Sequence, residues 1–399
     1  MKIKDATLRE IFDSRGEPTI GVCLANPQGR EFCAQVPSGK SRGKCEAAVF
    51  PPGKCTRILN KIRGVIKKKN FGSVSAFDRF LIALDGTPDK SRLGGNLMLG
   101  LSMAFARAFA ERKHGELWQF LNKEFFRPED TRRKPLIFSN LINGGLHAKN
   151  NLDFQEYLVI AETVGSYEKT VEDLIRLYEN LGAFLAKRVR GGLMPIGDEG
   201  GYAVNFRDNF EPLRVLEFLI SKMKLKNFHL GIDVAASSFY KSSDYRLGRE
   251  KIRTDDLVAL YARRFFAADN FLSIEDPFAE SDIYGFKSLT EKARSLSKWV
   301  VGDDLTVTNP ALIESAAESQ EINAVIIKPN QIGTVTETCE AIRTAKEHKL
   351  KVIVSHRSGE VEDNFIIHLA RACGADGLKI GAPARERIAK FNELLRIYG

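Results

Sequence analysis

A lysine stands at the end of an apolar run in the last quarter of the chain. Residues 324–327 read Ala-Val-Ile-Ile, and Lys328 and Pro329 follow directly. Such a run is typical of a strand buried on both faces, and a strand of this kind ends in a charge only where that charge has a role or a partner. Lys328 is therefore a candidate reactive amine, or else one half of an ion pair with an acidic residue of the wall.

Three carboxylates end other apolar runs, upstream of this lysine. Asp233 ends the run HLGID, Glu275 ends FLSIE, and Asp303 follows WVVG. Each carboxylate alone could cap a loop or pair with a lysine. Three hard oxygen donors at matching strand ends, without a neighbouring cysteine or histidine, are the ligands that Mg²⁺ prefers. The three residues are therefore candidate metal ligands.

Basic and hydroxyl residues end the last two runs. His356, Arg357 and Ser358 follow KVIVS, and Lys379 ends GLK. Beside a metal, these groups suit a substrate with several negative charges, and Arg357 with Ser358 suits a phosphate. A second lysine and divalent cations nearby would lower the pKa of Lys328, because like charge disfavours the ammonium. Lys328 then becomes a candidate general base.

Two glycine-containing stretches carry further candidates. Glu199 lies in the glycine-rich turn GDEGGYAVN, where backbone can approach a ligand, and NGGLHAKNNLDFQEY carries His147 and Glu156. A carboxylic acid kept protonated across the substrate from the lysine would let one group take a proton from carbon while the other assists a leaving hydroxyl. Acidic glycine-rich turns are common, so Glu199 by itself is weak evidence.

The spacing of these polar residues predicts the elements that position them. From Glu275 to Lys379 they recur every 22 to 28 residues, which is the length of one strand, one helix and two loops. In a (β/α) barrel, reactive groups gather at the C-terminal ends of the strands. A doubly wound open sheet has similar spacing but would concentrate polar residues at one switch point. The fold class predicted is α/β, a TIM-type (β/α)8 barrel.

A smaller α+β unit is predicted ahead of the barrel. Residues 19–36 alternate apolar and polar positions on both sides of the turn NPQG, which predicts an antiparallel hairpin. Small and apolar residues over 94–115 predict a buried helix on that sheet. The charged, proline-flanked stretch 125–135 is a candidate linker. The expected domains are 1–125 and 126–399.

Composition and charge describe an enzyme-sized folded protein. The chain has 399 residues, of which 43% are hydrophobic, and a formal net charge of +9. The basic stretch 54–70 is either an anion-binding surface or a solvated helix face. The N-terminus is too charged for a signal peptide, and no apolar run has the length of a membrane span. We therefore expect a cytoplasmic protein with no membrane partner.

Two further patterns, a glycine-lysine-serine loop and the cysteines, indicate neither a nucleotide site nor a zinc site. PSGKS resembles the end of a phosphate-binding loop, but Ala34 stands where the first glycine belongs, so a mobile loop carrying Ser41 toward the site is favoured. The six cysteines form no CxxC pair and show no zinc-like spacing, which predicts buried reduced thiols. They are Cys23, Cys33, Cys45, Cys55, Cys339 and Cys373.

Nearly end to end, the chain resembles the enolases, the 2-phosphoglycerate hydro-lyases of glycolysis. The resemblance rests on a series of motifs in a fixed order, and such a series is highly specific. The motifs are DSRGEPT, VPSGKSRG, ALDGTPDKSRLGGN, INGGLHAKNN, GDEGGYAVN, GIDVAASSFY, SIEDPF, VGDDLTVTNP, IKPNQIGTVTE, SHRSGEVED and KIGAPARERIAKFNELLRI.

The resemblance implies a reaction and a role for each candidate residue. It implies reversible dehydration of 2-phosphoglycerate to phosphoenolpyruvate. Lys328 would abstract the C2 proton, and Glu199 would act as general acid on the C3 hydroxyl, supported by Glu156. The implied substrate-binding residues are Lys379 for the carboxylate, Arg357 and Ser358 for the phosphate, and His147 and His356 along the pocket.

Metals and assembly are implied in the same way. Asp233, Glu275 and Asp303 would hold a first Mg²⁺, and Ser41 would meet a second Mg²⁺ that arrives with the substrate as its loop closes. The metals are needed because proton removal next to a carboxylate builds a dianion, which concentrated positive charge stabilises. The implied assembly is a homodimer or a higher homo-oligomer.

Departures from the family pattern keep two other functions open. The departing residues lie close to the implied site and are Lys40, Arg42, Leu146, Lys149, Val204 and Ile380. One alternative is a divergent paralogue of low activity that binds RNA or another polyanion, although a nucleic-acid partner is disfavoured. The other is a sugar-acid dehydratase or racemase, which the phosphate-suited pair Arg357 and Ser358 fits less well than it fits a phosphorylated three-carbon acid.

Overall fold

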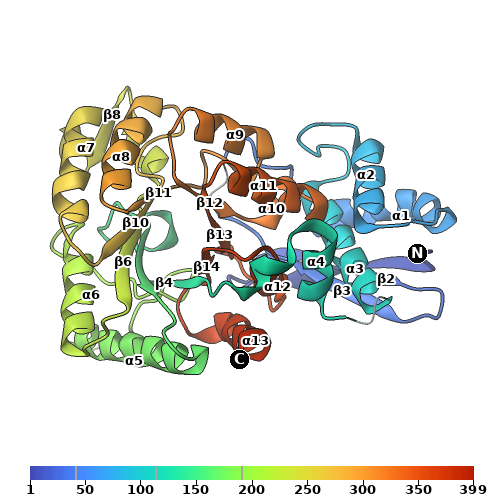
Figure 1. The fold of residues 1–399 in the computed structure, drawn as a ribbon, viewed down its shortest axis with the longest axis horizontal. Coiled ribbons are helices and arrows are strands. Elements are labelled where there is room, and N and C mark those ends of the chain that lie inside the picture. The colour runs from blue at the N-terminus through green and yellow to red at the C-terminus, as the bar shows by residue number, and fades with distance from the viewer. Residues whose placement is uncertain (41–42, 113–114, 190–191) are drawn as a thin grey trace.

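The protein consists of an N-terminal α+β unit beside a closed barrel wrapped in helices (Figure 1). The structure is a computed structural model that describes residues 1–40, 43–112, 115–189 and 192–399. None of the helices in that described part of the chain combines the length and apolarity that crossing a bilayer requires. The predicted fold class, a TIM-type barrel preceded by a smaller α+β unit, is confirmed.

The N-terminal unit is built on an antiparallel sheet in the order β1-β2-β3, with β1 at Asp5–Phe12, β2 at Pro18–Ala25 and β3 at Glu31–Val36. The predicted hairpin is confirmed as β2 and β3. Helix α3, Gly95–Arg112, packs on both strands, as predicted from its small and apolar residues. A β-carbon added at Gly100 would come within 2.6 Å of the Val22 side chain, so this glycine permits the close approach of helix and sheet.

Further helices complete the unit and lead to the barrel. Their bounds are α1 Pro52–Lys68, α2 Val74–Asp85 and α4 Leu117–Phe125. The basic stretch singled out in the sequence forms α1, whose apolar residues are buried against the sheet while its lysines face outward. The predicted linker contains one turn of 3₁₀ helix, Pro128–Arg132.

Among the described residues, eight strands close the barrel in the order β10-β11-β12-β13-β14-β4-β5-β6. Buried apolar runs form these strands, as the sequence predicts. Their bounds are β4 Leu136–Asn143, β5 Glu156–Ala161, β6 Phe228–Asp233, β10 Phe271–Glu275, β11 Trp299–Gly302, β12 Ala324–Ile327, β13 Lys351–Ser355 and β14 Gly377–Lys379.

Helices surround the barrel in the intervals between strands (Figure 1). They are α5 Tyr167–Ala186, α6 Glu211–Lys222, α7 Thr254–Tyr261, α8 Ile283–Ser295, α9 Pro310–Glu318, α10 Pro329–Ile332, α11 Val335–Glu347, α12 Phe365–Cys373 and α13 Ile388–Tyr398. A small three-stranded sheet lies between β6 and α7 in the chain, with β7 at Tyr240–Lys241, β8 at Asp244–Leu247 and β9 at Glu250–Ile252.

One strand departs from the regular β/α repeat. β5 runs antiparallel to both of its neighbours, β4 and β6, whereas the other adjacent pairs of the barrel are parallel. Its first residue, Glu156, therefore lies opposite Asn143 and Asp233, which are the last residues of β4 and β6. The strand reversal places Glu156 at the rim where the parallel strands end.

The two units are joined by buried polar contacts between α2 and α11. Asp78 accepts hydrogen bonds from the Thr336 backbone N–H at 2.9 Å and from the Thr336 hydroxyl at 2.6 Å. Nearby, Lys90 Nζ lies 2.7 Å from Glu337 Oε1. Asp78 is completely buried, and burial raises the pKa of its carboxyl to about 6.

Replacement of Asp78 by asparagine is expected to flatten the pH dependence of stability. Because the folded-state pKa lies above the unfolded value near 3.8, the stability contributed by the protonated carboxyl is complete below about pH 4 and is lost as the pH rises through 6. Between pH 5 and 8, the wild-type free energy of unfolding should fall by about 1–2 kcal/mol relative to Asp78→Asn. Urea denaturation at the two pH values measures this difference.

Thr336→Val is the matched control for that experiment. It removes the hydroxyl contact that lowers the pKa of Asp78 but keeps the titrating carboxyl, so its stability should fall between pH 5 and 8 by at least as much as that of the wild type. If Asp78→Asn and the wild type changed in parallel between pH 5 and 8, titration of this carboxyl would not contribute to stability.

The prediction of six buried reduced thiols is wrong for three cysteines. Cys23 and Cys33 form a disulfide, and Cys45 is exposed. The alternation of β2 buries Val22 and Leu24 on one face, so Cys23 points to the other face, directly opposite Cys33 in the register of the hairpin. The remaining cysteines are buried as predicted; they are Cys55, Cys339 and Cys373.

Candidate active site

The predicted site residues meet at the rim where the parallel barrel strands end. Asp233, Glu275 and Lys379 are the last residues of β6, β10 and β14. Asp303 and Lys328 directly follow β11 and β12. Each strand is mostly apolar and buried before this last position, which explains why the chain delivers its charged side chains to one end of the barrel.

Lys379 lies among three of the carboxylates. Its Nζ is 2.7 Å from Glu275 Oε2, 3.0 Å from Glu156 Oε2 and 3.7 Å from Asp233 Oδ2. Burial, partly offset by Lys379, raises the pKa of Glu275 to about 8 and that of Asp233 to about 6. One ammonium therefore does not balance these carboxylates, and the cluster favours further positive charge.

The donor set fits a hard divalent cation. Asp233, Glu275 and Asp303 are buried carboxylates at neighbouring strand ends, and the charges of Asp233 and Asp303 act on Glu275; carboxylate oxygens are the ligands that Mg²⁺ prefers. Glu275 Oε1 is buried and has no hydrogen-bond partner among the described residues. A buried anionic oxygen without a partner is costly unless a cation or donor satisfies it. The predicted metal ligands are thus suited to that role.

Two acidic residues beside this group were not singled out from the sequence. Carboxylate oxygens of Asp276, Asp303 and Asp304 lie within 4.8 Å of one another. Both carboxylate oxygens of Asp276 accept backbone hydrogen bonds, from the N–H of Asp303 at 2.9 Å and the N–H of Asp304 at 2.8 Å. Asp276 therefore fixes the strand end that carries Asp303, and the paired acids in SIED and GDDL were the signal for it.

Lys328 is paired with Asp303. The sequence had left open such an ion pair with an acidic residue of the wall. Its ammonium contacts Asp303 Oδ2, while Asp303 Oδ1 accepts a hydrogen bond from Gln331 Nε2 at 3.0 Å. Burial alone would lower the pKa of Lys328, but the charge of Asp303 outweighs burial and raises it. Without a bound cation, the pKa of Lys328 is therefore raised; the lowering predicted from the sequence depends on divalent cations beside this lysine.

Glu199 and Glu156 form the acidic side of the site, around one histidine. His147 Nδ1 lies 3.5 Å from Glu199 Oε1 and 3.7 Å from Glu156 Oε1. Asn140 donates a hydrogen bond of 2.7 Å to Glu199 Oε2. The structure thus brings together the three residues that two separate stretches of the sequence suggested.

The pKa values of the two glutamates shift in opposite directions. Burial and the neighbouring charge of Glu199 raise the pKa of Glu156 well above its usual range. Burial would also raise the pKa of Glu199, but His147, His356 and Lys379 outweigh burial and lower it. These directions favour the protonated form of Glu156 and the ionised form of Glu199, whereas the sequence assigned the protonated acid to Glu199.

Arg357 is held from both units of the protein. Its guanidinium lies 3.2 Å from Glu46 and donates a hydrogen bond of 3.0 Å to Asn330 Oδ1. A β-carbon added at Gly39 would lie 1.6 Å from Arg357 Nη2, so only glycine lets the backbone pass this close. Glu46 and Asn330 were not predicted, because nothing local in the sequence connects them with Arg357.

The other residues of this loop are also fixed. His356 Nε2 lies 3.8 Å from Glu199 Oε1, which links the loop to the acidic side. Ser358 Oγ accepts a hydrogen bond of 3.0 Å from the backbone N–H of Lys40. Buried Arg387 donates to the Ser358 carbonyl at 2.9 Å, a supporting contact that the sequence gave no reason to expect.

Ser41, the predicted ligand of a second metal, lies outside the described residues, as does Arg42. The other departures from the family pattern are distributed between surface and core. Lys40, Leu146 and Lys149 are exposed, and Val204 and Ile380 are buried. Of the exposed residues, Lys40 makes an ion pair with Asp198, the neighbour of Glu199.

Comparisons with known proteins agree with this geometry. A family profile described as "Enolase, N-terminal domain" matches residues 3–121, and one described as "Enolase, C-terminal TIM barrel domain" matches residues 132–399. Proteins named "Enolase" from Anaplasma marginale, Helicobacter pylori and Methanopyrus kandleri are each 39% identical to this chain. These similarities cover 99 to 100% of this chain and 94 to 96% of the relatives. The chain has a buried rim of lysines and carboxylates at the mouth of a barrel, and it has enolase relatives over its whole length. The chain therefore belongs to the enolase family.

Proposed function

We propose that this protein catalyses the reversible dehydration of 2-phosphoglycerate to phosphoenolpyruvate. One observation carries the proposal, beyond the membership of the enolase family. Lys328 and the pair Glu156–Glu199 are brought to one barrel mouth, where a basic group and an acidic group can act on the same small molecule. The elimination of water requires this combination, because one group must accept a proton from carbon and the other must donate one to oxygen.

Lys328 and Glu199 have complementary roles in the proposed reaction. Lys328 Nζ accepts the proton from C2 after it has lost its own, and the electron pair of the C–H bond stays with the substrate. The C3–O bond then breaks, Glu199 donates a proton to the departing hydroxyl, and water leaves as the C2–C3 double bond forms. Glu156, whose pKa is raised and whose carboxylate lies within 4.8 Å of that of Glu199, supports the supply of that proton.

The remaining predicted residues bind the substrate. Lys379 suits the carboxylate, and Arg357 with Ser358 suits the phosphate, because guanidinium and hydroxyl groups can donate several hydrogen bonds to one anion. His147 and His356 line the wall between these ends, each within 4 Å of Glu199. The substrate class is thus a phosphorylated three-carbon acid.

Asp233, Glu275 and Asp303 are the proposed ligands of a first Mg²⁺, and Ser41 is the proposed contact of a second that arrives with the substrate. When bound, these cations supply positive charge that stabilises the dianion formed by proton removal. A cation held by Asp303 would offset the negative charge that raises the pKa of Lys328.

Three further features belong to the same proposal. The domain division is 1–125 and 126–399, which agrees with the change from an antiparallel sheet to the barrel. The expected assembly is a homodimer or a higher homo-oligomer, by the resemblance to the family. The expected compartment is the cytoplasm.

Mg²⁺ is expected to switch the activity on and to stabilise the fold. Phosphoenolpyruvate formation, followed by its ultraviolet absorbance, should require Mg²⁺ and should stop with excess chelator. A ligand that binds only the folded state raises its stability, by about 2.7 kcal/mol at a concentration of 100 times Kd. The Tm should therefore rise with Mg²⁺ in the wild type.

Glu275→Gln is the variant that makes this test specific. It keeps the size of the side chain but removes one proposed charged ligand, so both the Tm increase and the activity should decline. Glu280→Gln, at a half-buried position on the following loop, should respond to Mg²⁺ as the wild type does. Turnover that persists in excess chelator would overturn the proposed metal requirement.

A further inference from the structure

Residues 37–40 cross from the N-terminal sheet to the mouth of the barrel. Ser38 and Gly359 exchange two backbone hydrogen bonds, of 2.8 and 2.9 Å. The Lys40 N–H donates to Ser358 Oγ at 3.0 Å. The segment is therefore attached by its backbone to the loop that carries the proposed phosphate-binding residues.

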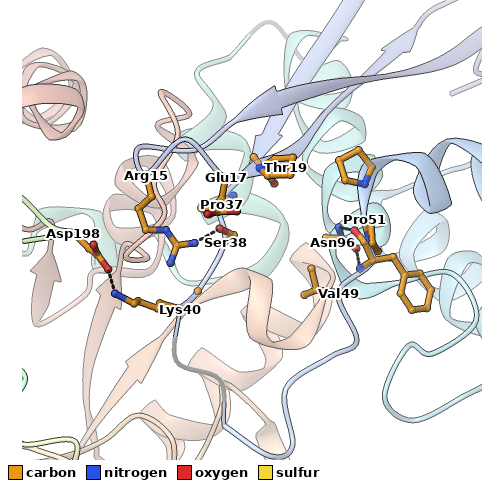
Figure 2. A pocket seen from close by; sticks show the side chains of 14 residues that line it. Arg15, Glu17, Thr19, Pro37, Ser38, Lys40, Val49, Pro51, Asn96 and Asp198 are labelled. Carbon is orange, nitrogen blue, oxygen red and sulfur yellow. Dashed lines mark hydrogen bonds and ion pairs between the residues drawn. The ribbon is translucent and has the colours of Figure 1, made fainter. Parts of the chain in front are cut away.

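The side chain of Lys40 reaches a second loop of the barrel. Its Nζ lies 2.9 Å from Asp198 Oδ2, and Asp198 directly precedes Glu199. Figure 2 shows this ion pair spanning from the crossing segment to Asp198, beside Arg15 and Ser38. Both partners line a cavity of about 630 Å³ at the boundary of the two units. A single residue thus connects the Ser358 loop with the turn that holds Glu199.

We propose that Lys40, through its ion pair with Asp198, is a positioning residue that sets the distance between the phosphate-binding loop and the acidic side of the site. The proposal rests on the proposed function for the roles of Ser358 and Glu199. We call this contact the Lys40–Asp198 clasp. The backbone of Lys40 is fixed on one loop and its ammonium on the other, so movement of either loop strains the same side chain.

The clasp also acts through charge. Lys40 balances the carboxylate of Asp198 at a site proposed to receive an anionic substrate. Removal of Lys40 alone leaves that negative charge beside the mouth, where it repels the substrate. Removal of both partners restores the charge balance but not the attachment. The two effects can therefore be separated by changing one partner or both.

The expected effects are modest, because the clasp is partly exposed. The Lys40 side chain is 45% exposed and that of Asp198 is 22% exposed. Ion pairs in such positions are screened by water and salt, and they contribute at most a few-fold to an equilibrium. We expect changes of about two- to fivefold, which careful kinetics resolve.

A double-mutant cycle tests the clasp in the full-length protein. Lys40→Ala should raise KM and lower kcat, because it leaves Asp198 unbalanced and the turn unattached. Asp198→Asn should lower kcat without raising KM. The double variant should resemble Asp198→Asn, with each effect weaker in high salt. Lys44→Ala, at an exposed position of the following loop, is the control with the same change of charge.

Additive effects in this cycle would overturn the proposal, and so would a Lys44→Ala protein that matched Lys40→Ala. A second measurement does not depend on turnover. Amide hydrogen exchange in peptides covering residues 37–40 and 197–200 should be about two- to fivefold faster in Lys40→Ala and Asp198→Asn than in the wild type or Lys44→Ala.

The two measurements separate the failure of the clasp from the failure of the proposed function. Unchanged exchange in Lys40→Ala overturns the clasp, whatever the activity. Faster exchange in Lys40→Ala and Asp198→Asn, together with a wild-type protein that forms no phosphoenolpyruvate, supports the clasp and overturns the proposed reaction instead.

Discussion

Replacement of Lys328 by alanine is expected to lower kcat by about 10³- to 10⁴-fold, because the variant has no group to accept the C2 proton. The lysine is positioned by β12 and paired with Asp303, so no other described ammonium stands at that position of the rim. Phosphoenolpyruvate formation measures the loss. Exchange of the C2 proton of 2-phosphoglycerate in deuterated water, followed by NMR, should be lost as well.

Lys351→Ala is a suitable control for the Lys328 variant. Lys351 begins the neighbouring strand β13 at the opposite end of the barrel wall, where it pairs with Asp376 at 3.2 Å. Its removal should leave turnover and exchange near the wild-type level. C2 exchange that continued in Lys328→Ala would show that another group is the base.

The same variant also distinguishes the enzyme from a polyanion-binding paralogue. Binding of an RNA oligonucleotide through an external basic surface would not require a buried lysine of the barrel mouth. The paralogue would be favoured if the wild type showed no turnover and if the wild type and Lys328→Ala bound the oligonucleotide equally tightly. Metal-dependent turnover that is lost in the variant supports the proposed reaction.

Glu199→Gln is expected to separate the two halves of the reaction. Glutamine keeps the shape and can still accept the hydrogen bond from Asn140, but it cannot donate a proton to the leaving hydroxyl. Dehydration should therefore fall by about 10²- to 10³-fold. Exchange of the C2 proton should persist, because Lys328 is unchanged. The two rates are measured in the same samples, by absorbance and by NMR.

Glu156→Gln provides the critical comparison, since the pKa of Glu156 is raised while that of Glu199 is lowered. If Glu199 is the acid that faces the leaving group, Glu156→Gln should be the milder variant. If Glu156→Gln instead showed the loss of dehydration with retained exchange, the two glutamates would have to change roles.

The candidate site residues that lie at the barrel rim share a local signal in the sequence. Asp233, Glu275, Asp303 and Lys379 each interrupt or end an apolar run, and the barrel then brings all such positions to one rim. Spacing alone was sufficient to predict the barrel. No knowledge of long-range contacts was needed, because each strand–helix repeat places the last residue of its strand at the same end of the barrel.

The missed features depend on contacts between distant segments. Glu46 pairs with Arg357 from the other unit of the protein, and neither neighbouring sequence indicates the pairing. The direction of β5 follows from a missing crossover helix rather than from its own residues. The raised pKa of Lys328 follows from its pairing with Asp303, whereas the sequence argument considered only neighbouring cations.

The disulfide was predictable from information already used. The turn of the predicted hairpin fixes its register, and that register places Cys23 opposite Cys33. Pairing of side chains on the outward face was overlooked because both cysteines were assumed to be buried. A hairpin prediction should therefore always be followed by inspection of its facing pairs.

The reversal of β5 has a consequence for how the chain folds. β4 and β5 pair across a connection of only 12 residues, from 144 to 155, so little chain entropy is lost when they meet. β14 and β4 instead join residues such as Gly377 and Leu136, about 240 positions apart. The hairpin can form early and locally, while ring closure between β14 and β4 has to wait for most of the chain. Folding of the barrel can therefore begin, with little loss of chain entropy, at the strand that carries Glu156 to the rim.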